Sequence, residues 1–235
     1  MIVSDKFVFI HLHKTAGQFI SSALLKYVGG CQQIGYHWPR KYLPAEFQGL
    51  PLLGFVRNPW DWYVSWFCFN QQKPGKYNPL YAVMSDGGRN KFASTITNMI
   101  HFGGSSKKSQ RHLSILRKTL PNSLKGNRGI GLTRSCLNTA NGSFYSWQFR
   151  RMFSDDSGQF DGMNFARMEN LRVDFLNFLE RIEVSVPQEM KTFIEIGEKQ
   201  NSSRHDHYRN YYDDDLRILI EDNDRLIVEK FGYRF

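Results

Sequence analysis

The sequence predicts an α/β fold in which helices flank a central parallel β-sheet in three layers. Two observations carry this prediction. Three apolar runs of strand length lie at residues 6–12, 50–57 and 163–168, and each leads into a segment with apolar residues at helical spacing. Strands that alternate with helices form parallel sheets, and strands buried on both faces read as continuous apolar runs. We expect a single domain over residues 1–235.

The first strand-and-helix unit occupies the first 30 residues. Residues 6–12 (KFVFIHL) predict a buried strand, and a polar loop, His13-Lys14-Thr15-Ala16-Gly17-Gln18, follows it. The next segment, FISSALLKYV, predicts a helix that ends at Gly29-Gly30. Its core-facing residues are Phe19, Ala23, Leu24 and Val28.

The second unit starts with residues 50–57 (LPLLGFVR), which predict another buried strand. A helix start follows directly: Asn58 is a favourable N-cap, and Pro59 fits the first helical position. Asp61 adds a negative charge at the positive end of the helix dipole. We expect this helix to continue through WYVSWFCF.

The third unit consists of a strand at residues 163–168 and a helix over LRVDFLNFLERI. The stretch DDDLRILIEDNDRLIVEKFGYRF predicts a helix that begins with acidic residues and stops at Gly232. The core-facing residues of the LRVDFLNFLERI helix are Leu171, Phe175, Phe178, Leu179 and Ile182.

Residues 71–161 read as a variable region of helices and mobile loops on the acceptor side of the same domain. Helical patches occur at KFASTITNMIHF and SFYSWQFRRMF, and GGSSKKSQ and KGNRGIGLTRS read as loops. Positive charge gathers here, which favours an anionic or polyhydroxylated ligand but also fits solvated loop charge. The basic residues in which this charge is concentrated are Lys107, Lys108, Arg111, Arg117, Lys118, Lys125, Arg128 and Arg134.

The composition excludes several classes of protein. Apolar residues make up 41% of the chain, which excludes a disordered chain, and the net charge of +9 favours either an anionic partner or plain solubility. Three cysteines, at 31, 68 and 136, match neither a disulfide framework nor a metal site. The apolar runs are too short to span a membrane. We therefore expect a soluble cytoplasmic protein without a metal.

The loop after the first strand is a candidate anion site. Backbone N–H groups at a helix N-terminus bind anions, Gly17 allows a close approach, and Lys14 and Thr15 add a charge and a hydroxyl. The loop lacks the glycine and Lys-Ser/Thr pattern of a Walker A motif. A plain turn with a surface lysine remains the alternative.

The end of the second predicted strand offers a further anion contact. Arg57 ends the strand, and Ser65 lies two turns into the next helix, so a guanidinium fork and a hydroxyl can close on one phosphate group. The alternative is that Arg57 pairs with Asp61 and that Ser65 has no role in binding.

These motifs together resemble the sulfotransferases that use 3′-phosphoadenosine 5′-phosphosulfate (PAPS), in particular the glycan O-sulfotransferases and their bacterial relatives. IHLHKTAGQFI and FVRNPWDWYVSWF are similar to the two cofactor motifs of that family, in order. FARMENLRVDF and the segment from NSSRHDHYRNYY to FGYRF resemble two further elements. The similarity covers residues 7–70 and 163–235 and implies a P-loop-like fold.

The resemblance implies a role for each matching residue. Lys14 would contact the bridging oxygen of the 5′-phosphosulfate, and Arg57 and Ser65 would hold the 3′-phosphate. Ser203 and Arg204 would close over the nucleotide. This chain carries Gln18 and Met168 where many relatives have a hydroxyl residue and an aromatic one. The loop residues implied to contact the cofactor are His13, Lys14, Thr15, Ala16, Gly17, Gln18 and Phe19.

The acceptor hydroxyl needs a base, and histidine is the natural one near neutral pH. His37, in GYHWPRKYLP, matches the histidine that glycan sulfotransferases carry between the two cofactor motifs; a loop histidine stacked on Trp38 is the alternative. His11 reads as a packed core residue, and His13 lies too close to the donor. The other histidines are His101, His112, His205 and His207.

The sequence thus predicts a PAPS-dependent O-sulfotransferase in which His37 takes the acceptor proton. Lys14 neutralises the departing 3′,5′-adenosine bisphosphate. We expect an acceptor with a hydroxyl group, such as a glycan, and no nucleic acid polymer as partner. Two alternatives remain open: a nucleotide or small-molecule kinase, and a non-enzymatic basic protein that binds RNA or glycans. The aromatic residues most suited to line an acceptor cleft are Tyr36, Trp38 and Tyr42.

Overall fold

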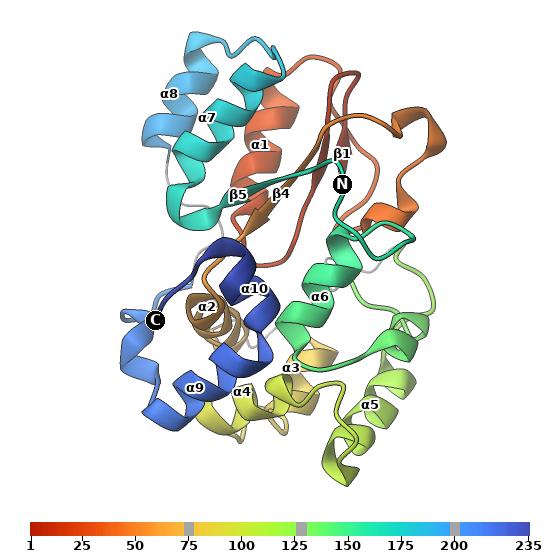
Figure 1. Cartoon of the computed structure of the whole chain (residues 1–235), viewed down its shortest axis with the longest axis vertical. Coiled ribbons are helices and arrows are strands. Elements are labelled where there is room, and N and C mark those ends of the chain that lie inside the picture. The colour runs from red at the N-terminus through yellow and green to blue at the C-terminus, as the bar shows by residue number, and fades with distance from the viewer. Residues whose placement is uncertain (73–77, 126–130, 198–202) are drawn as a thin grey trace. The chain divides into compact units, whose positions relative to one another are not determined.

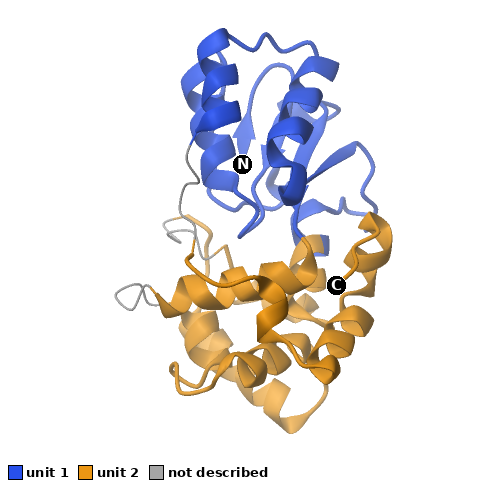
Figure 2. Ribbon diagram, turned by 90° about the vertical axis from the view of Figure 1, so that its left-hand side faces the viewer, with its two compact units in different colours: residues 1–57, 150–201 blue, residues 58–149, 202–235 orange. Residues whose placement is uncertain are grey.

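The computed structural model describes residues 1–72, 78–125, 131–197 and 203–235, and its fold is α/β (Figure 1). The chain divides into two compact units, each built from two separate stretches (Figure 2). Unit 1 consists of residues 1–57 and 150–201, and unit 2 of residues 58–149 and 202–235. The expectation of a single domain stays a prediction.

Unit 1 contains a five-stranded sheet in the order β3-β1-β2-β4-β5. Strands β2, β4 and β5 are parallel, whereas β1 runs antiparallel to both β2 and β3. The sheet is therefore mostly parallel rather than wholly parallel. The strand bounds are β1 Ile2–Val3, β2 Val8–Ile10, β3 Gln32–Gln33, β4 Leu52–Val56 and β5 Met163–Arg167.

The antiparallel strand β1 arises from a tight turn that the apolar pattern did not predict. The Ser4 hydroxyl oxygen accepts hydrogen bonds from the Lys6 and Phe7 backbone N–H groups, and the Ser4 N–H donates to the Phe7 carbonyl oxygen at 3.0 Å. A serine side chain that satisfies the turn backbone in this way reverses the chain within four residues. Ile2 thereby comes to pair with Phe9.

The three parallel strands form the centre of unit 1. Leu52 pairs with Val8 on one side and with Met163 on the other, so β2, β4 and β5 point toward the same edge of the sheet. In the middle of β4, a Cβ atom on Gly54 would lie 2.5 Å from the Phe153 ring. Glycine at this position lets the ring pack directly on the strand.

Helices α1 (Gly17–Tyr27), α7 (Leu171–Arg181) and α8 (Gln188–Ile196) cover one face of the sheet (Figure 1). The Arg172 guanidinium fastens α7 to the end of α8 by hydrogen bonds to the carbonyl oxygens of Ile194 and Gly197. The sequence predicted α1 and α7 but not α8. The core-facing residues predicted for α1 and α7 are confirmed as buried or packed on the core: Phe19, Ala23, Leu24, Val28, Leu171, Phe175, Phe178, Leu179 and Ile182.

Unit 2 is built around α2, whose start is as predicted. The Asn58 side-chain oxygen accepts a hydrogen bond from the Asp61 N–H at 3.3 Å, and Pro59 occupies the first turn. The helices wholly within unit 2 are α2 Pro59–Gln71, α3 Pro79–Met84, α4 Phe92–Ile100, α5 Lys107–Thr119, α9 Asp214–Asn223 and α10 Arg225–Phe231. Helix α6 Phe144–Phe153 begins in unit 2, and its residues from Arg150 on belong to unit 1. Single-turn helices lie at Arg40–Tyr42, Ala45–Phe47, Ser135–Thr139, Met168–Asn170 and Tyr208–Tyr211.

The region 71–161 is more helical than predicted. Helices α4 and α6 match the two predicted patches, but α5 begins within GGSSKKSQ, which was expected to be a loop. The Ser106 hydroxyl oxygen caps α5 by accepting from the Ser109 N–H at 3.1 Å, and Leu113 and Leu116 are buried. Two leucines three residues apart thus form the apolar side of a helix whose other residues, apart from Ile115, are polar.

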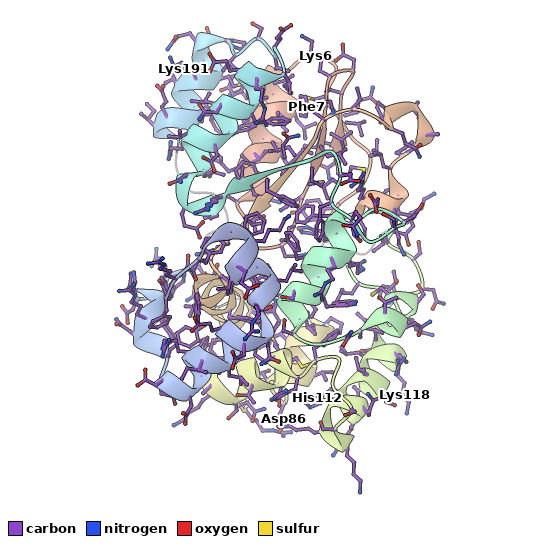
Figure 3. The ribbon with its side chains drawn as sticks, in the orientation of Figure 1. Lys6, Phe7, Asp86, His112, Lys118 and Lys191 are labelled. Atoms are coloured by element: carbon purple, nitrogen blue, oxygen red, sulfur yellow. The ribbon has the colours of Figure 1, made fainter. Side chains whose placement is uncertain are left out.

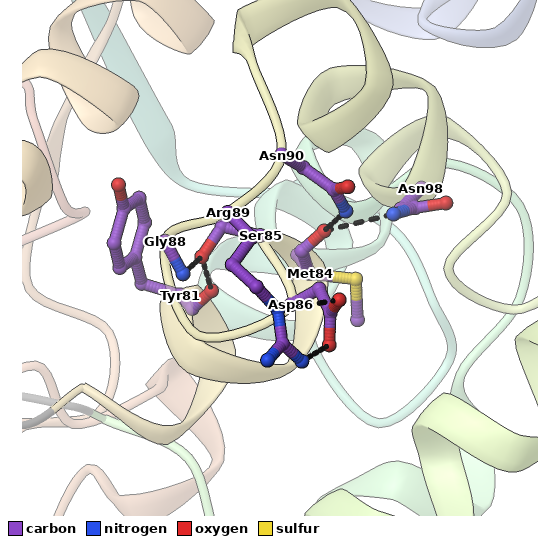
Figure 4. A network of polar contacts seen from close by, with 8 residues as sticks. All are labelled: Tyr81, Met84, Ser85, Asp86, Gly88, Arg89, Asn90 and Asn98. Carbon is purple, nitrogen blue, oxygen red and sulfur yellow. Dashed lines mark hydrogen bonds and ion pairs between the residues drawn. The ribbon is translucent and has the colours of Figure 1, made fainter.

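A network of hydrogen bonds stabilises the turn that follows α3 (Figure 4). The Ser85 hydroxyl donates to the Tyr81 carbonyl oxygen at 2.6 Å and accepts from the Gly88 N–H at 2.8 Å. The side chain of Asn98 donates to the Met84 carbonyl oxygen at 2.8 Å, which ties α4 to the end of α3. These bonds satisfy the carbonyl groups that a short helix leaves open at its C-terminus.

The predicted C-terminal helix is interrupted at Asp224, which separates α9 from α10. The Asp224 carboxylate is fully buried and accepts hydrogen bonds from the Tyr63 hydroxyl at 2.9 Å and from the N–H and hydroxyl of Ser146 at 3.0 and 2.7 Å. The Ser143 hydroxyl donates to it as well. Burial raises the pKa of this carboxyl group, although its hydrogen bonds act in the opposite direction. The inward turn of this side chain accounts for the break.

Candidate active site

The candidate site in unit 1 lies where two parallel strands end side by side. Strand β2 leads into the loop His13–Gln18, and Arg57 follows its neighbour β4. The Arg57 guanidinium donates a hydrogen bond to the Lys14 carbonyl oxygen at 3.2 Å, and Arg57 as a whole residue is 9% exposed. Two residues predicted to bind opposite ends of one ligand are therefore neighbours in the fold.

The backbone of the loop is held in an unusual conformation. Lys14 and Ala16 have φ angles of 62° and 57°, in the left-handed region that residues other than glycine enter at a cost of about 1 kcal/mol or more. Left-handed residues that alternate with right-handed ones turn successive N–H groups toward a common point, which is a known anion-binding arrangement. The Thr15 hydroxyl donates to the Leu12 carbonyl oxygen at 2.9 Å, so it stabilises the loop from within.

The N-terminus of α1 has no cap within the described residues. Ala16 occupies the N-cap position, and its side chain has no hydrogen-bond acceptor. The Ile20 N–H donates to the Ala16 carbonyl oxygen and makes the first backbone hydrogen bond of the helix. The N–H groups of Gly17, Gln18 and Phe19 therefore stand at the positive end of the helix without a protein acceptor in the described part of the chain. Three such donors favour an anion.

Glycine at position 17 is required by the neighbouring ring of His11. A Cβ atom on Gly17 would lie 1.7 Å from Cδ2 of His11, which is shorter than any real contact. His11 is buried, as predicted, and its ring stacks on Phe9 at a centroid distance of 5.9 Å. The glycine thus lets α1 begin directly against the histidine ring.

Two further loop residues have defined positions. The side-chain amide of Gln18 donates a hydrogen bond to the Tyr36 hydroxyl oxygen. The Phe19 ring is buried and stacks on Phe193 at a centroid distance of 5.0 Å. Because the Phe19 side chain belongs to the core, the group that it offers at the helix N-terminus is its backbone N–H.

The candidate base His37 lies in a cluster of three histidines. Its ring is 5% exposed and stacks on His13 with a centroid distance of 3.5 Å, and the His11 ring lies at 4.1 Å. Its Nδ1 atom is 2.9 Å from the His11 carbonyl oxygen. A carbonyl oxygen can only accept, so Nδ1 carries the proton, and Nε2 is left as the basic nitrogen of the neutral ring.

The surroundings keep the rings of His37 and His11 neutral. Burial lowers the pKa of His37 well below the usual 6.5, and the charges of His13 and His11 lower it further. The pKa of His11 is lowered in the same way, first by burial and then by His13. At pH 7 both rings are therefore uncharged, and Nε2 of His37 can accept a proton. His37 stacks on His13, while Trp38 packs over Gly35.

The remaining cofactor residues predicted from the sequence lie in unit 2, along α2. The Ser203 hydroxyl donates to the Ser65 carbonyl oxygen at 3.2 Å. The Arg204 N–H donates to the side-chain oxygen of Gln72 at 3.0 Å, and the Gln72 amide donates to the Arg204 carbonyl oxygen. Segments almost 140 residues apart in the sequence are thus joined, and Ser65, Ser203 and Arg204 lie close together.

The predicted basic region falls mainly on one helix. Most of its residues are exposed on α5, on which Figure 3 labels His112 and Lys118. Arg134 instead donates from Nε to the Leu120 carbonyl oxygen at 2.7 Å. Arg128 lies outside the described residues. The exposed basic residues of α5 are Lys107, Lys108, Arg111, Arg117 and Lys118.

Sequence reasoning missed two features of this site. His11 and His13 follow the end of β2, and both contact the His37 ring, with centroid distances of 4.1 and 3.5 Å, which no periodicity in the sequence indicates. Tyr36 was predicted only as a residue suited to line an acceptor cleft, and no pattern in the sequence shows its hydrogen bond with Gln18. That contact depends on the path of the chain after β3.

Among the described residues, no cluster of histidine, cysteine or acidic side chains could hold a metal ion. In the same part of the chain, no helix has the length and apolar character needed to cross a membrane. Comparisons of the chain with family models, with curated proteins and with solved structures find no match.

Proposed function

We propose that this protein is a sulfotransferase that moves a sulfuryl group from PAPS to a hydroxyl group of a carbohydrate or another polyhydroxylated acceptor. The observation that carries the proposal is the hydrogen bond from Arg57 to the Lys14 carbonyl oxygen, beside the uncapped N-terminus of α1. Two cationic side chains and three backbone donors at adjoining strand ends fit a ligand with two anionic groups. The resemblance in the sequence supports a P-loop-like form of the α/β fold.

Each residue of the loop has a role in this proposal. The N–H groups of Gly17, Gln18 and Phe19 hold the 5′-phosphosulfate, and the Lys14 ammonium neutralises the phosphate oxygen from which sulfur departs. Arg57 binds the 3′-phosphate. Ser65, Ser203 and Arg204 belong to the 3′-phosphate and nucleotide contacts on the basis of the resemblance alone.

The transfer requires no covalent bond between the protein and the sulfuryl group. PAPS supplies the sulfuryl group: the acceptor oxygen forms a bond to sulfur while the bond from sulfur to the phosphate oxygen breaks, which leaves 3′,5′-adenosine bisphosphate. Nε2 of His37 takes the acceptor proton, since Nδ1 is engaged with the His11 carbonyl oxygen. Positioning and charge stabilisation supply the rest of the rate enhancement, as in phosphoryl transfer.

The two alternative functions make different demands. A kinase of related layout needs a Walker-type Gly-Lys-Ser/Thr loop and Mg²⁺, and HLHKTAGQ carries no such motif. A non-enzymatic basic protein accounts for the charge on α5 but gives no role to the buried Arg57 or to the neutral His37. A cytoplasmic location agrees with the three free cysteines and stays a prediction.

Isothermal titration calorimetry tests the proposal. We expect 3′,5′-adenosine bisphosphate to bind at least about tenfold more tightly than ATP with Mg²⁺, because only the former presents the 3′-phosphate that Arg57 requires. Tighter binding of ATP would favour the kinase, and absence of binding by either nucleotide would refute the sulfotransferase. Transfer of ³⁵S from labelled PAPS to a panel of glycans then identifies the acceptor class.

A further inference from the structure

The Tyr36 hydroxyl lies beside the N-terminal turn of α1, where Gln18 is the second residue. The side-chain amide of Gln18 donates its hydrogen bond to the Tyr36 oxygen. A phenol can accept one bond and still donate its own proton. Among the described residues, no acceptor receives that proton. Gln18 thus fixes the hydroxyl oxygen in space and leaves its O–H for another group.

The ring of Tyr36 is held in place by the histidine cluster. Its edge contacts are with His37 at a centroid distance of 4.5 Å and an interplanar angle of 78°, and with His11 at 5.5 Å and 76°. Both of those rings are buried. A side chain packed on two fixed rings loses little further conformational entropy when its hydroxyl binds a ligand. The hydroxyl is therefore preorganised.

We propose that Tyr36 is a binding residue for the 5′-anionic group of the donor, to which its hydroxyl donates a hydrogen bond, and that Gln18 is the residue that positions it. This inference rests on the proposed function. A phosphate or sulfate oxygen only accepts, so it complements an O–H already oriented by a neighbouring amide. Gln18 then acts on the ligand in two ways, through its own backbone N–H and through the phenol of Tyr36.

The test compares two nucleotides that differ only in the 5′-phosphate. For Tyr36→Phe we expect the Kd of 3′,5′-adenosine bisphosphate to rise about tenfold, the effect of one hydrogen bond to a charged group. The Kd of adenosine 3′-monophosphate should stay unchanged. The matched control is Tyr27→Phe, which removes the hydroxyl of a half-buried tyrosine at the last residue of α1 and should leave both constants unchanged.

A double-mutant cycle tests the role of Gln18. Gln18→Met keeps the length and helix propensity of the side chain but removes the amide, so we expect it to weaken adenosine bisphosphate binding by nearly as much as Tyr36→Phe. The double variant should bind no more weakly than Tyr36→Phe alone, because both changes abolish the same contact. Losses that simply add would overturn the proposed pairing.

The outcomes separate this inference from the proposed function. If the wild-type chain binds adenosine bisphosphate and Tyr36→Phe binds it equally well, or loses affinity for both nucleotides equally, Tyr36 does not contact the 5′-group and the inference is wrong, while the sulfotransferase proposal stands. If the wild-type chain binds neither nucleotide, the proposed function fails, and the role of Tyr36 fails with it.

Discussion

The guanidinium of Arg57 and the main-chain carbonyl oxygen of Lys14 are joined by a hydrogen bond of 3.2 Å. The bond connects the first residue after β4 to the loop after β2, two positions that are 43 residues apart. It satisfies a carbonyl group in a strained loop and at the same time fixes the direction of a nearly buried cation. Arg57 thus both stabilises the loop and places a positive charge beside it.

Replacement of Arg57 by alanine should weaken binding of nucleotides with a 3′-phosphate more than binding of those without it. We expect the Kd of 3′,5′-adenosine bisphosphate to rise at least about thirtyfold and that of AMP less than about fivefold, the smaller change reflecting the loosened loop. Calorimetry measures both constants, with Arg181→Ala as the control for loss of a positive charge in unit 1. Equal losses for the two nucleotides would remove the assigned role.

Replacement of His37 by alanine should abolish turnover while leaving the donor in place. We expect kcat to fall about 10²- to 10⁴-fold, the usual contribution of a general base, with the Kd of adenosine bisphosphate changed less than about threefold. The ³⁵S transfer assay and calorimetry check the two quantities, and His101→Ala serves as control. Turnover retained in His37→Ala would place the base elsewhere, and His13→Ala then tests the adjacent ring.

The lowered pKa of the buried His37 makes stability depend on pH. Because the pKa of His37 is lowered in the folded state, the unfolded chain binds more protons below about pH 6.5, so the free energy of unfolding falls as the pH drops from 7 to 5. Urea denaturation of His37→Gln should show a shallower fall, by up to about 1.4 kcal/mol per pH unit. Identical slopes for this variant and the wild-type chain would show that the folded ring takes up its proton as readily as the unfolded one.

Replacement of Gly17 by alanine should displace the His11 ring. The added methyl carbon would lie 1.7 Å from Cδ2 of His11, so either the ring or the start of α1 must move. We expect a loss of about 2–3 kcal/mol of unfolding free energy and weaker binding of adenosine bisphosphate. Gly29→Ala is the matched control, since nothing lies within 4 Å of the added atom there. A Gly17→Ala chain as stable as the wild type would contradict this packing.

The buried Asp224 should be essential for unit 2. Alanine at this position leaves the hydroxyl groups of Tyr63, Ser143 and Ser146 without their acceptor, and we expect a loss of about 3 kcal/mol in urea denaturation. Asp222→Ala, an exposed acid two residues earlier, should cost less than about 0.5 kcal/mol. Similar losses for the two variants would show that the buried network contributes little.

The elements with a strong apolar period could be predicted from the sequence. Strands β2 and β4 are continuous buried runs, and helices α1 and α7 bury apolar residues at helical spacing, so pattern and structure agree. Helix α2 starts at the predicted Asn58 cap, and β5 pairs with β4 although only Ala166 of β5 is buried. Strands β1 and β3 are only two residues long, which is too short for a periodic pattern of apolar residues to show in the sequence. They are defined by their pairing with neighbouring strands. The interruption at Asp224 was missed because its partners lie on α2 and at the start of α6, far away in the sequence.

In the candidate site, too, the features set by neighbouring residues could be predicted from the sequence, and those set by distant residues could not. The loop after β2 and the position of Arg57 follow from strand ends in a parallel sheet, which a pattern can predict. The orientation of His37 depends on a left-handed backbone, with a φ angle of 52°, and on a carbonyl group 26 residues away. Neither the tautomer of His37 nor the bond between Gln18 and Tyr36 is encoded in residues that are neighbours in the sequence.

The division of each unit into two separate stretches has a consequence for biosynthesis. Strand β4 pairs with β5 only after the intervening segment of more than 100 residues has been synthesised, because Leu52 lies beside Met163. The nascent sheet of unit 1 therefore exposes the open edge of β4 while most of unit 2 emerges from the ribosome. Such long-range pairing slows folding and leaves this edge open to pairing with other chains until β5 has been synthesised.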